Sequence, residues 1–299
     1  ASGKAVALTQ TGSYFANVGE MTIAADGTIT TKLIPTHEGM DAGIAAMQTG
    51  WVNTVDDMLG EKIAVGDSDF YVSDPAIGKR RIRSAETNLG DFVADGIYAY
   101  FNEVEKLHCD LAIMNGGGIR ADVPAGDWTF KTCKQVSPFG NVACLMSVTG
   151  KQIQDALEFA ARFAGAEGKE NGGFLQVAGA TYEIHTDIPN TVQTDDKNVW
   201  IGSATGTPRV QNVKIYDRAN GTYVPLDENK TYALAGMNYT LRNLGDGFAM
   251  FDGAELIKDY VSEDYLVMST YAMTFGGVDA EGLPHLSSAN SVLAEYPGY

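Results

Sequence analysis

The sequence of 299 residues predicts an α+β fold in which helices pack on a mixed β-sheet. Three patterns predict it. Residues 22–34 place an Asp-Gly turn between two strand-like stretches, which is the pattern of a β-hairpin. Residues 89–101 repeat apolar side chains every three or four positions, as the buried face of a helix does. Residues 111–114 and 142–148 are apolar runs of strand length, typical of strands inside a sheet.

The first part of the chain predicts a short β segment followed by one helix. Residues 5–34 predict two or three strands, and residues 41–60 change to the helical period and end at Gly60. These elements are too small to bury a core of their own, which predicts the end of another domain and a connecting helix. The apolar face of that helix would consist of Ile44, Met47, Trp51, Val55 and Met58.

A larger α+β domain is predicted from residue 62 onward. Its first helix would be capped by Asn88, with Asp91 at the N3 position. Residues 263–273 fit either a helix or a strand. The other predicted elements are a helix over residues 150–164, strands over 174–186, 209–216 and 231–237, a loop over 187–208 and a short helix over 252–261.

The composition excludes some classes of function. A net charge of −17 argues against binding of a nucleic-acid polymer, because little positive charge is available to replace counterions. The sequence contains no stretch of 18 apolar residues, so it predicts no membrane span. The first residues do not have the pattern of a signal peptide, which is consistent with a processed protein or a piece of a longer one.

The cysteines and histidines do not predict a metal site. Cys144 lies in an apolar run and is expected to be a buried thiol, while one disulfide among Cys109, Cys133 and Cys144 stays an open alternative. None of the four histidines has another histidine or a cysteine at the spacing of metal ligands. These histidines are His37, His108, His185 and His285.

The glycine tract after residues 111–114 is the first candidate for a binding site. Asn115 ends the apolar run, three glycines follow, and Arg120 closes the turn. Three successive glycines indicate positive φ or a close backbone approach. We expect the strand end to present backbone N–H groups, an amide and a guanidinium to a ligand, although a tight turn with a surface arginine is the alternative. The glycine spacing matches neither a dinucleotide fingerprint nor a P-loop.

Four further loops have an unusual composition. Residues 83–90 lead a basic run into a helix N-terminus, which favours an anion. Residues 137–141 carry Phe139 on a Pro/Gly turn, where we expect it to be exposed. Residues 171–176 repeat the glycine-then-strand pattern, and residues 238–248 contain Tyr239 and Asp246. Each loop alone fits ordinary turn chemistry. Together they favour a nucleoside phosphate, with rings for the base, a carboxylate for ribose and guanidinium groups for phosphate.

These loops, in this order, resemble the C-terminal domain of the 5′-nucleotidase family, which includes ecto-5′-nucleotidases, UDP-sugar hydrolases and 2′,3′-cyclic-nucleotide phosphodiesterases. The resemblance covers about residues 62–299. It is carried by Arg83 with residues 86–90, by residues 115–120 (Asn-Gly-Gly-Gly-Ile-Arg), 138–141 (Pro-Phe-Gly-Asn) and 173–177 (Gly-Phe-Leu-Gln-Val), and by residues 245–248 (Gly-Asp-Gly-Phe). In that family this domain binds the nucleotide, so the resemblance implies a 5′-nucleotidase C-terminal domain-like fold and a nucleotide or nucleoside ligand.

The resemblance also implies roles for seven residues. The second stacking aromatic of the family lies six positions before the aspartate, where this chain has Thr240, so we assign that role to Tyr239 with a loop one residue longer. Lys79 is expected to add positive potential. The seven roles are Arg83 and Arg120 on the phosphate and ribose side, Asn115 on the nucleoside, Phe139 and Tyr239 around the base, Gly172 for close backbone approach and Asp246 on the ribose hydroxyls.

The resemblance further implies a catalytic domain that this chain lacks. Residues 1–40 resemble the last strands of the metallophosphoesterase domain of the family, and residues 41–61 its interdomain helix. The metal-binding motifs Asp-x-His, Gly-Asp-x-x-Asp, Asn-His-Asp/Glu and Gly-His-x-His are absent. Two divalent ions of the Zn or Mn type are therefore expected in a catalytic domain in cis, and this chain alone is expected to be inactive. The resemblance also implies a secreted, periplasmic or cell-surface location.

Two alternatives accompany this interpretation. The chain could be a stand-alone nucleotide- or nucleoside-binding module, although such a module would not need the strands over residues 5–34. Within the family the substrate could instead be a nucleotide sugar, a cyclic nucleotide or a thioester without a nucleotide. The pair Phe139 and Tyr239 favours a ligand that carries a base.

Overall fold

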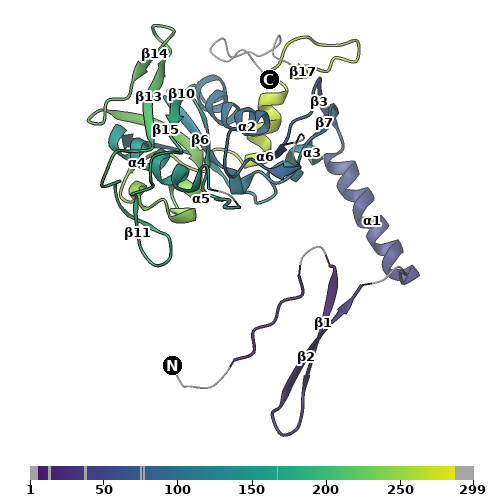
Figure 1. Cartoon of the computed structure of the whole chain (residues 1–299). Helices are drawn as coiled ribbons and strands as arrows, with labels where there is room; N and C mark the ends of the chain where they lie inside the picture. The colour runs from purple at the N-terminus through teal and green to yellow at the C-terminus, as the bar shows by residue number, and fades with distance from the viewer. Residues whose placement is uncertain are drawn as a thin grey trace. The chain divides into compact units, whose positions relative to one another are not determined.

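The computed structural model describes residues 6–12, 15–36, 39–74, 76, 78–166 and 168–286. The chain divides into two compact units, Ala1–Thr54 and Val55–Tyr299 (Figure 1). Parts of the predicted spans 1–40 and 62–299 therefore lie outside the described residues, as do residues 13 and 14 within the predicted first strands.

The first unit contains the predicted hairpin. Strands β1 (Asn17–Ile23) and β2 (Ile29–Pro35) pair antiparallel in a single register. The turn between them works as its sequence predicts, because Asp26 accepts a hydrogen bond from the N–H of Thr28 (2.9 Å) and Gly27 has φ +85°. Helix α1 (Ala42–Leu59) follows, as predicted, and the boundary between the two units falls inside it.

The second unit is built on a mixed five-stranded sheet with the order β16-β8-β15-β6-β9. Strands β15 and β6 are parallel and the other pairs are antiparallel, which confirms the predicted α+β class. The strands are β6 (Leu111–Asn115), β8 (Ala143–Thr149), β9 (Leu175–Ala178), β15 (Thr231–Met237) and β16 (Glu255–Lys258).

The described residues of this unit also form two three-stranded sheets and two small hairpins. One sheet has the order β17-β3-β7 and the other the order β10-β13-β14. Their strands are β3 (Lys62–Gly66), β7 (Gly126–Thr129), β17 (His285–Leu286), β10 (Ala180–Ile184), β13 (Val210–Asp217) and β14 (Thr222–Pro225), and the hairpins are β4 (Ser73–Asp74) with β5 (Lys79–Arg80) and β11 (Gln193–Thr194) with β12 (Trp200–Gly202).

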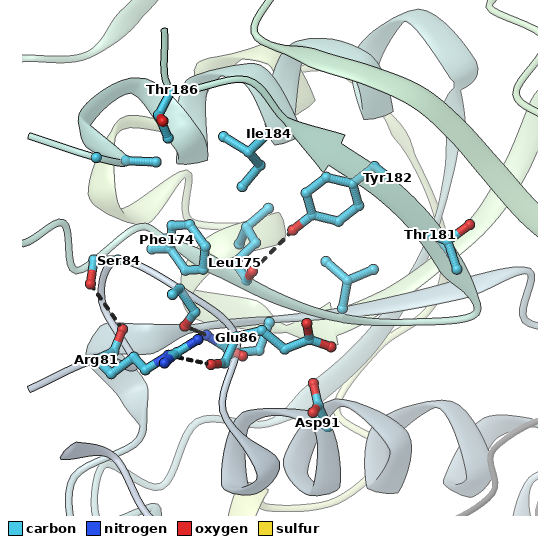
Figure 2. Close-up of a pocket in the computed structure, with 16 residues that line it drawn as sticks. Arg81, Ser84, Glu86, Asp91, Phe174, Leu175, Thr181, Tyr182, Ile184 and Thr186 are labelled. Carbon is cyan, nitrogen blue, oxygen red and sulfur yellow. Dashed lines mark hydrogen bonds between the residues drawn. The ribbon is translucent and has the colours of Figure 1, made fainter. Parts of the chain in front are cut away.

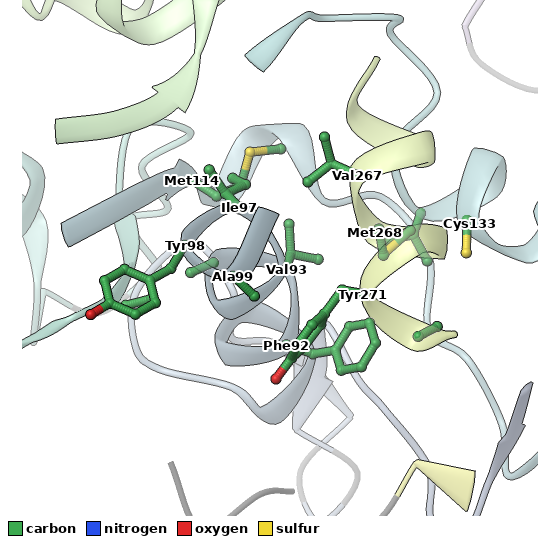
Figure 3. Close-up of a cluster of buried hydrophobic side chains, with 14 of the residues drawn as sticks. Phe92, Val93, Ile97, Tyr98, Ala99, Met114, Cys133, Val267, Met268 and Tyr271 are labelled. Atoms are coloured by element: carbon green, nitrogen blue, oxygen red, sulfur yellow. The ribbon is translucent and has the colours of Figure 1, made fainter. Parts of the chain in front are cut away.

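Helices cover both faces of the central sheet, so its inner strands β8, β15 and β6 are mostly apolar and buried, whereas edge strand β16 is exposed. Along β6, Leu111 and Ile113 belong to one buried cluster, whereas Ala112 and Met114 belong to another. The first cluster, here the α4-face cluster, contains the apolar side of α4 (Gly150–Ala160). The second, here the α2-face cluster, contains side chains of α2 (Asn88–Ala99), α3 (Phe130–Val136) and α6 (Asp264–Ala272). Figure 3 shows Phe92 of α2 beside Tyr271 of α6.

The structure corrects several element boundaries. The N-cap of α2 is Thr87, whose hydroxyl accepts from the N–H of Gly90 (3.0 Å), and the side chain of Asn88 instead donates to the carbonyl of Asp69 (2.8 Å). The predicted strand over residues 174–186 is interrupted at Gly179, which has φ +76°. The helix predicted over residues 150–164 ends at Ala160 and continues as a 3-10 turn.

The structure also tests the elements predicted for the C-terminal part of the chain. The helix predicted over residues 252–261 is wrong, because Glu255–Lys258 forms edge strand β16 and pairs with β8. Residues 263–273, which fitted a helix or a strand, form α6. The predicted loop over 187–208 contains the hairpin of β11 and β12. The predicted strands over 209–216 and 231–237 are confirmed as β13 and β15.

Candidate functional site

The glycine tract forms a 3-10 turn (Gly116–Gly118) directly after β6. A Cβ at Gly116 would lie 2.2 Å from the carbonyl oxygen of Ile82, so close backbone approach, rather than positive φ, requires glycine there. The N–H groups of the first two glycines donate to the carbonyls of Phe174 and Gly172 (both 2.7 Å). The expectation that these two N–H groups face a ligand is therefore wrong, since they tie the turn to the neighbouring segment.

A cavity of about 630 Å³ opens beside this turn. Six of the seven predicted site residues line it, although they come from five separate loops. The lining residues are Arg83, Asn115, Gly117, Gly118, Phe139, Asn141, Gly172, Tyr239 and Asp246. The fold thus brings together the loops that the sequence singles out. A cavity of this size accommodates a small organic ligand.

The carboxylate of Asp246 is the polar centre of this cavity. It accepts hydrogen bonds from Nδ2 of Asn115 (3.0 Å) and from the hydroxyl of Tyr239 (3.1 Å). Its backbone has φ +55°, a conformation that aspartate and asparagine tolerate better than most residues. Burial and the adjacent carboxylate raise the pKa of Tyr239, so its hydroxyl keeps the proton that it donates. Among the described residues, the buried Oδ1 of Asn115 has no hydrogen-bond partner.

The two predicted aromatic residues are both accessible. Phe139 is 58% exposed and Tyr239 is 37% exposed, whereas Thr240 is buried. Tyr239, and not Thr240, therefore faces the cavity. A Cβ at Gly245 would lie 2.5 Å from the Tyr239 ring, so this glycine allows the ring to lie against the backbone. An exposed aromatic side chain at a cavity is suited to stacking on a planar ligand.

Three guanidinium groups gather at one side of the cavity. Arg120 is not among the lining residues, but its guanidinium lies 5.7 Å from the centroid of Phe139 and donates to the carbonyl of Gly117 (3.3 Å). Arg83 lines the cavity, and its Nη1 is 3.8 Å from Glu170. Burial, Arg83 and Arg120 lower the pKa of Arg80 below its usual range. On a strongly acidic chain this cluster concentrates positive charge in one place.

Sequence reasoning missed Arg80 and Asn141. Arg80 is half-buried beside Arg83 and Arg120, whereas Lys79, the predicted extra cation, is exposed. Strand β5 consists of only two residues, so no periodicity in the sequence distinguishes Arg80 from Lys79. Asn141 lies two residues after Phe139, and its N–H donates to buried Asp264 (3.1 Å), which holds the loop.

A second cavity of about 570 Å³ lies beside the loop that carries Arg83 (Figure 2). Figure 2 shows Glu86 of this loop near Asp91 of α2, with Tyr182 across the cavity. Burial, together with the charges of Glu86 and Asp95, raises the pKa of Asp91 to about 8. Asp91 therefore keeps its proton near neutral pH.

We expect Asp91→Asn to reduce the pH dependence of stability. Between about pH 4 and pH 8, Asp91 is protonated in the folded chain and ionised in the unfolded chain, so the free energy of unfolding falls as pH rises. Asparagine removes this ionisation, so the variant should have a higher Tm than the wild type at pH 8 but not at pH 4. Thermal unfolding followed by circular dichroism measures the slope. Exposed Asp196→Asn should keep the wild-type slope, and an unchanged slope in Asp91→Asn would contradict the assignment.

Three further features of the described residues concern metal binding, disulfides and membrane-spanning helices. Within the described ranges, no three His, Cys, Asp or Glu side chains are grouped to hold a metal ion, and His37 lies outside those ranges. Cys109, Cys133 and Cys144 are buried free thiols, so no disulfide joins them. In the same part of the chain, no helix has both the length and the apolar character that crossing a membrane requires.

Comparisons with known proteins identify the family that this chain resembles. The family described as 5′-nucleotidase, C-terminal domain matches residues 64–253. The Trifunctional nucleotide phosphoesterase protein YfkN of Bacillus subtilis (strain 168) is 35% identical over 227 residues, which cover 75% of this chain and 13% of that protein. The NAD 5′-nucleotidase of Haemophilus influenzae is 32% identical over 160 residues, covering 54% of this chain and 23% of that protein.

A solved structure shows the same fold over most of the chain. The 5′-nucleotidase precursor from Thermus thermophilus superposes with a TM-score of 0.63 at 25% identity, and the match covers 90% of this chain and 50% of that one. This chain thus spans half or less of the length of the relatives that it matches here. The matched region includes all seven predicted site residues. The chain belongs to the 5′-nucleotidase C-terminal domain family.

Proposed function

We propose that residues 62–299 form the substrate-binding domain of a nucleotide phosphohydrolase that releases phosphate from nucleotides. One observation carries this proposal: a single cavity gathers two accessible aromatic rings, an asparagine, an aspartate and an arginine from separate loops. These groups match the parts of a nucleoside phosphate. The names of similar proteins, which include 5′-nucleotidases and a nucleotide phosphoesterase, support the same class of substrate.

In this proposal each part of the ligand has its own partners. The base stacks between Phe139 and Tyr239, and the ribose hydroxyls bind the carboxylate of Asp246. Asn115 binds the nucleoside through its unpartnered Oδ1, and Arg83 and Arg120 bind on the phosphate and ribose side. The space that a Cβ at Gly172 would occupy is free of close protein contacts, since the nearest atoms, on Asp246, would be 3.7 Å away. The ligand can therefore approach the backbone of Gly172 closely.

We further propose that hydrolysis takes place in a catalytic domain in cis, of which residues 1–40 are the last part and residues 41–61 the connecting helix. Two features support this. The strands β1 and β2 expose apolar side chains such as Val18, Ile23 and Leu33, and none of the described residues of α1 is buried. An isolated two-stranded hairpin is marginally stable, so a larger domain would cover these side chains.

The chemistry of that domain would depend on metal ions. Two divalent ions of the Zn or Mn type would supply the hydroxide that attacks phosphorus. This chain would supply affinity and selectivity, and alone it would release no phosphate. By the same family relationship we propose a secreted, periplasmic or cell-surface location.

Calorimetric titration of this chain with AMP, adenosine and UDP-glucose tests the proposal. We expect saturable binding of at least one of these ligands, equally strong with and without Mn²⁺, because the proposed contacts involve protein groups only. The ligand with the highest affinity distinguishes a nucleotide site from a nucleotide-sugar site. If the folded chain binds none of the three, the proposed binding function is wrong.

A further inference from the structure

The side chain of Gln176 holds the loop that carries Arg83. Gln176 lies in β9 and is only 2% exposed. Its Nε2 donates to the carbonyls of Ile82 (3.1 Å) and Ala85 (3.0 Å), and its Oε1 accepts from the N–H of Thr87 (3.3 Å). Both N–H groups and the carbonyl of one buried amide are thus bound to a single loop of six residues.

The amide of Gln176 is closely packed by the residues around it. A Cβ at Gly90 of α2 would lie 2.1 Å from Oε1 of Gln176. The loop is also fixed from its other side, because the N–H of Asn171 donates to the carbonyl of Arg83 (3.0 Å) and Gly116 packs against Ile82. The backbone at Arg83 therefore has a defined position before any ligand binds.

The guanidinium of Arg83 depends on that backbone, because its own contacts are weak. Its closest carboxylate oxygen, on Glu170, is 3.8 Å away, beyond hydrogen-bond distance, and Glu170 is partly exposed. Among the described residues, the buried Nε of Arg83 has no hydrogen-bond partner. The side chain of Arg83 is only 26% exposed, so its backbone and the packing around it set its direction, and it lines the cavity.

We propose that Gln176 is a positioning residue for the anion end of the site, where it aligns Arg83 with the phosphate of the ligand. This inference rests on the proposed function, since it takes phosphate as the group that Arg83 binds. Gln176 does not line the cavity of about 630 Å³ in which the nucleotide is proposed to bind, so it has no direct contact with base or ribose. Loss of its hydrogen bonds should therefore weaken nucleotide binding and leave nucleoside binding nearly unchanged.

The test compares AMP with adenosine in the variant Gln176→Met, which keeps the length of the side chain and removes its hydrogen bonds. We expect the Kd for AMP to rise about tenfold, as for the loss of one hydrogen bond to a charged group, and the Kd for adenosine to stay within about twofold. Gln154→Met is the matched control, because Gln154 makes a similar bond to the carbonyl of Val210 (2.9 Å) far from Arg83 in sequence and outside the cavity. It should change neither Kd.

A second variant covers the case in which Gln176→Met does not fold. Gly90→Ala should displace the amide of Gln176 while favouring helix α2, and it should produce the same selective loss of AMP affinity. Equal losses for AMP and adenosine, or no loss, would overturn the role of Gln176.

Hydrogen exchange of the ligand-free chain separates this inference from the proposed function. Gln176→Met should accelerate exchange at the amide of Thr87, which loses its acceptor. If the wild-type chain binds neither ligand, the proposed function fails, and exchange alone decides whether Gln176 fixes the loop. Unchanged exchange at Thr87 would reject that as well.

Discussion

Replacing Phe139 with alanine is expected to weaken binding of AMP and of adenosine about fivefold or more, because stacking of a base on an aromatic ring contributes about 1–3 kcal/mol. The loss should be similar for both ligands, since they carry the same base. Phe139 is 58% exposed, so its removal creates no internal cavity and should leave the Tm nearly unchanged. Calorimetry and thermal unfolding measure the two effects.

Tyr260→Ala is the control for this experiment. Tyr260 is also a largely exposed aromatic residue, and it does not line the cavity. Its removal should not change either Kd. If Phe139→Ala binds both ligands as the wild type does, the base does not stack on this ring and the ligand lies elsewhere.

Replacing Asp246 with asparagine is expected to weaken adenosine binding about tenfold to a hundredfold, because hydrogen bonds to a charged group contribute about 1.5–3 kcal/mol. Asparagine is the appropriate substitution, since it tolerates the φ of +55° at this position, whereas alanine would add backbone strain. The new amide would also face Nδ2 of Asn115 or the hydroxyl of Tyr239, both of which now donate to the carboxylate.

A ligand without ribose hydroxyls identifies the contact. The wild type should bind 2′,3′-dideoxyadenosine more weakly than adenosine, and Asp246→Asn should remove most of this preference. Asp252→Asn, on the exposed surface, should keep it. If Asp246→Asn loses equal affinity for both ligands, the carboxylate organises the site and does not bind ribose.

The sequence predicts the lining of the cavity well because each lining residue lies on a loop of distinctive composition. Asn115, Phe139 and Asp246 stand next to glycines that serve turns or close approaches, and such glycines are visible in the sequence. Helix α2 follows from the apolar periodicity that buries Phe92 and Ile97. The role of Tyr239 follows from the family resemblance, although its stacking position falls on Thr240, and only the structure shows that Thr240 is buried.

Contacts between distant segments could not be predicted in the same way. Gln176 and Ile82 are 94 positions apart, and nothing in a Leu-Gln-Val strand indicates that the amide binds another loop. The raised pKa of Asp91 likewise depends on burial that the sequence does not reveal. The prediction of a helix over residues 252–261 fails for the same reason. Pairing of β16 with β8, and not the periodicity of its own sequence, determines the conformation of this segment.

The three buried thiols can report separately on the opening of the two layers that cover the central sheet. Cys109 and Cys133 belong to the α2-face cluster and Cys144 to the α4-face cluster. Burial raises the pKa of each thiol, to about 12 for Cys133 and Cys144, so a thiol reagent reacts only when the structure opens. A nucleotide that slows all three reactions by one factor would show that both layers unfold as a single cooperative unit. Different factors would divide the domain into two units of separate stability.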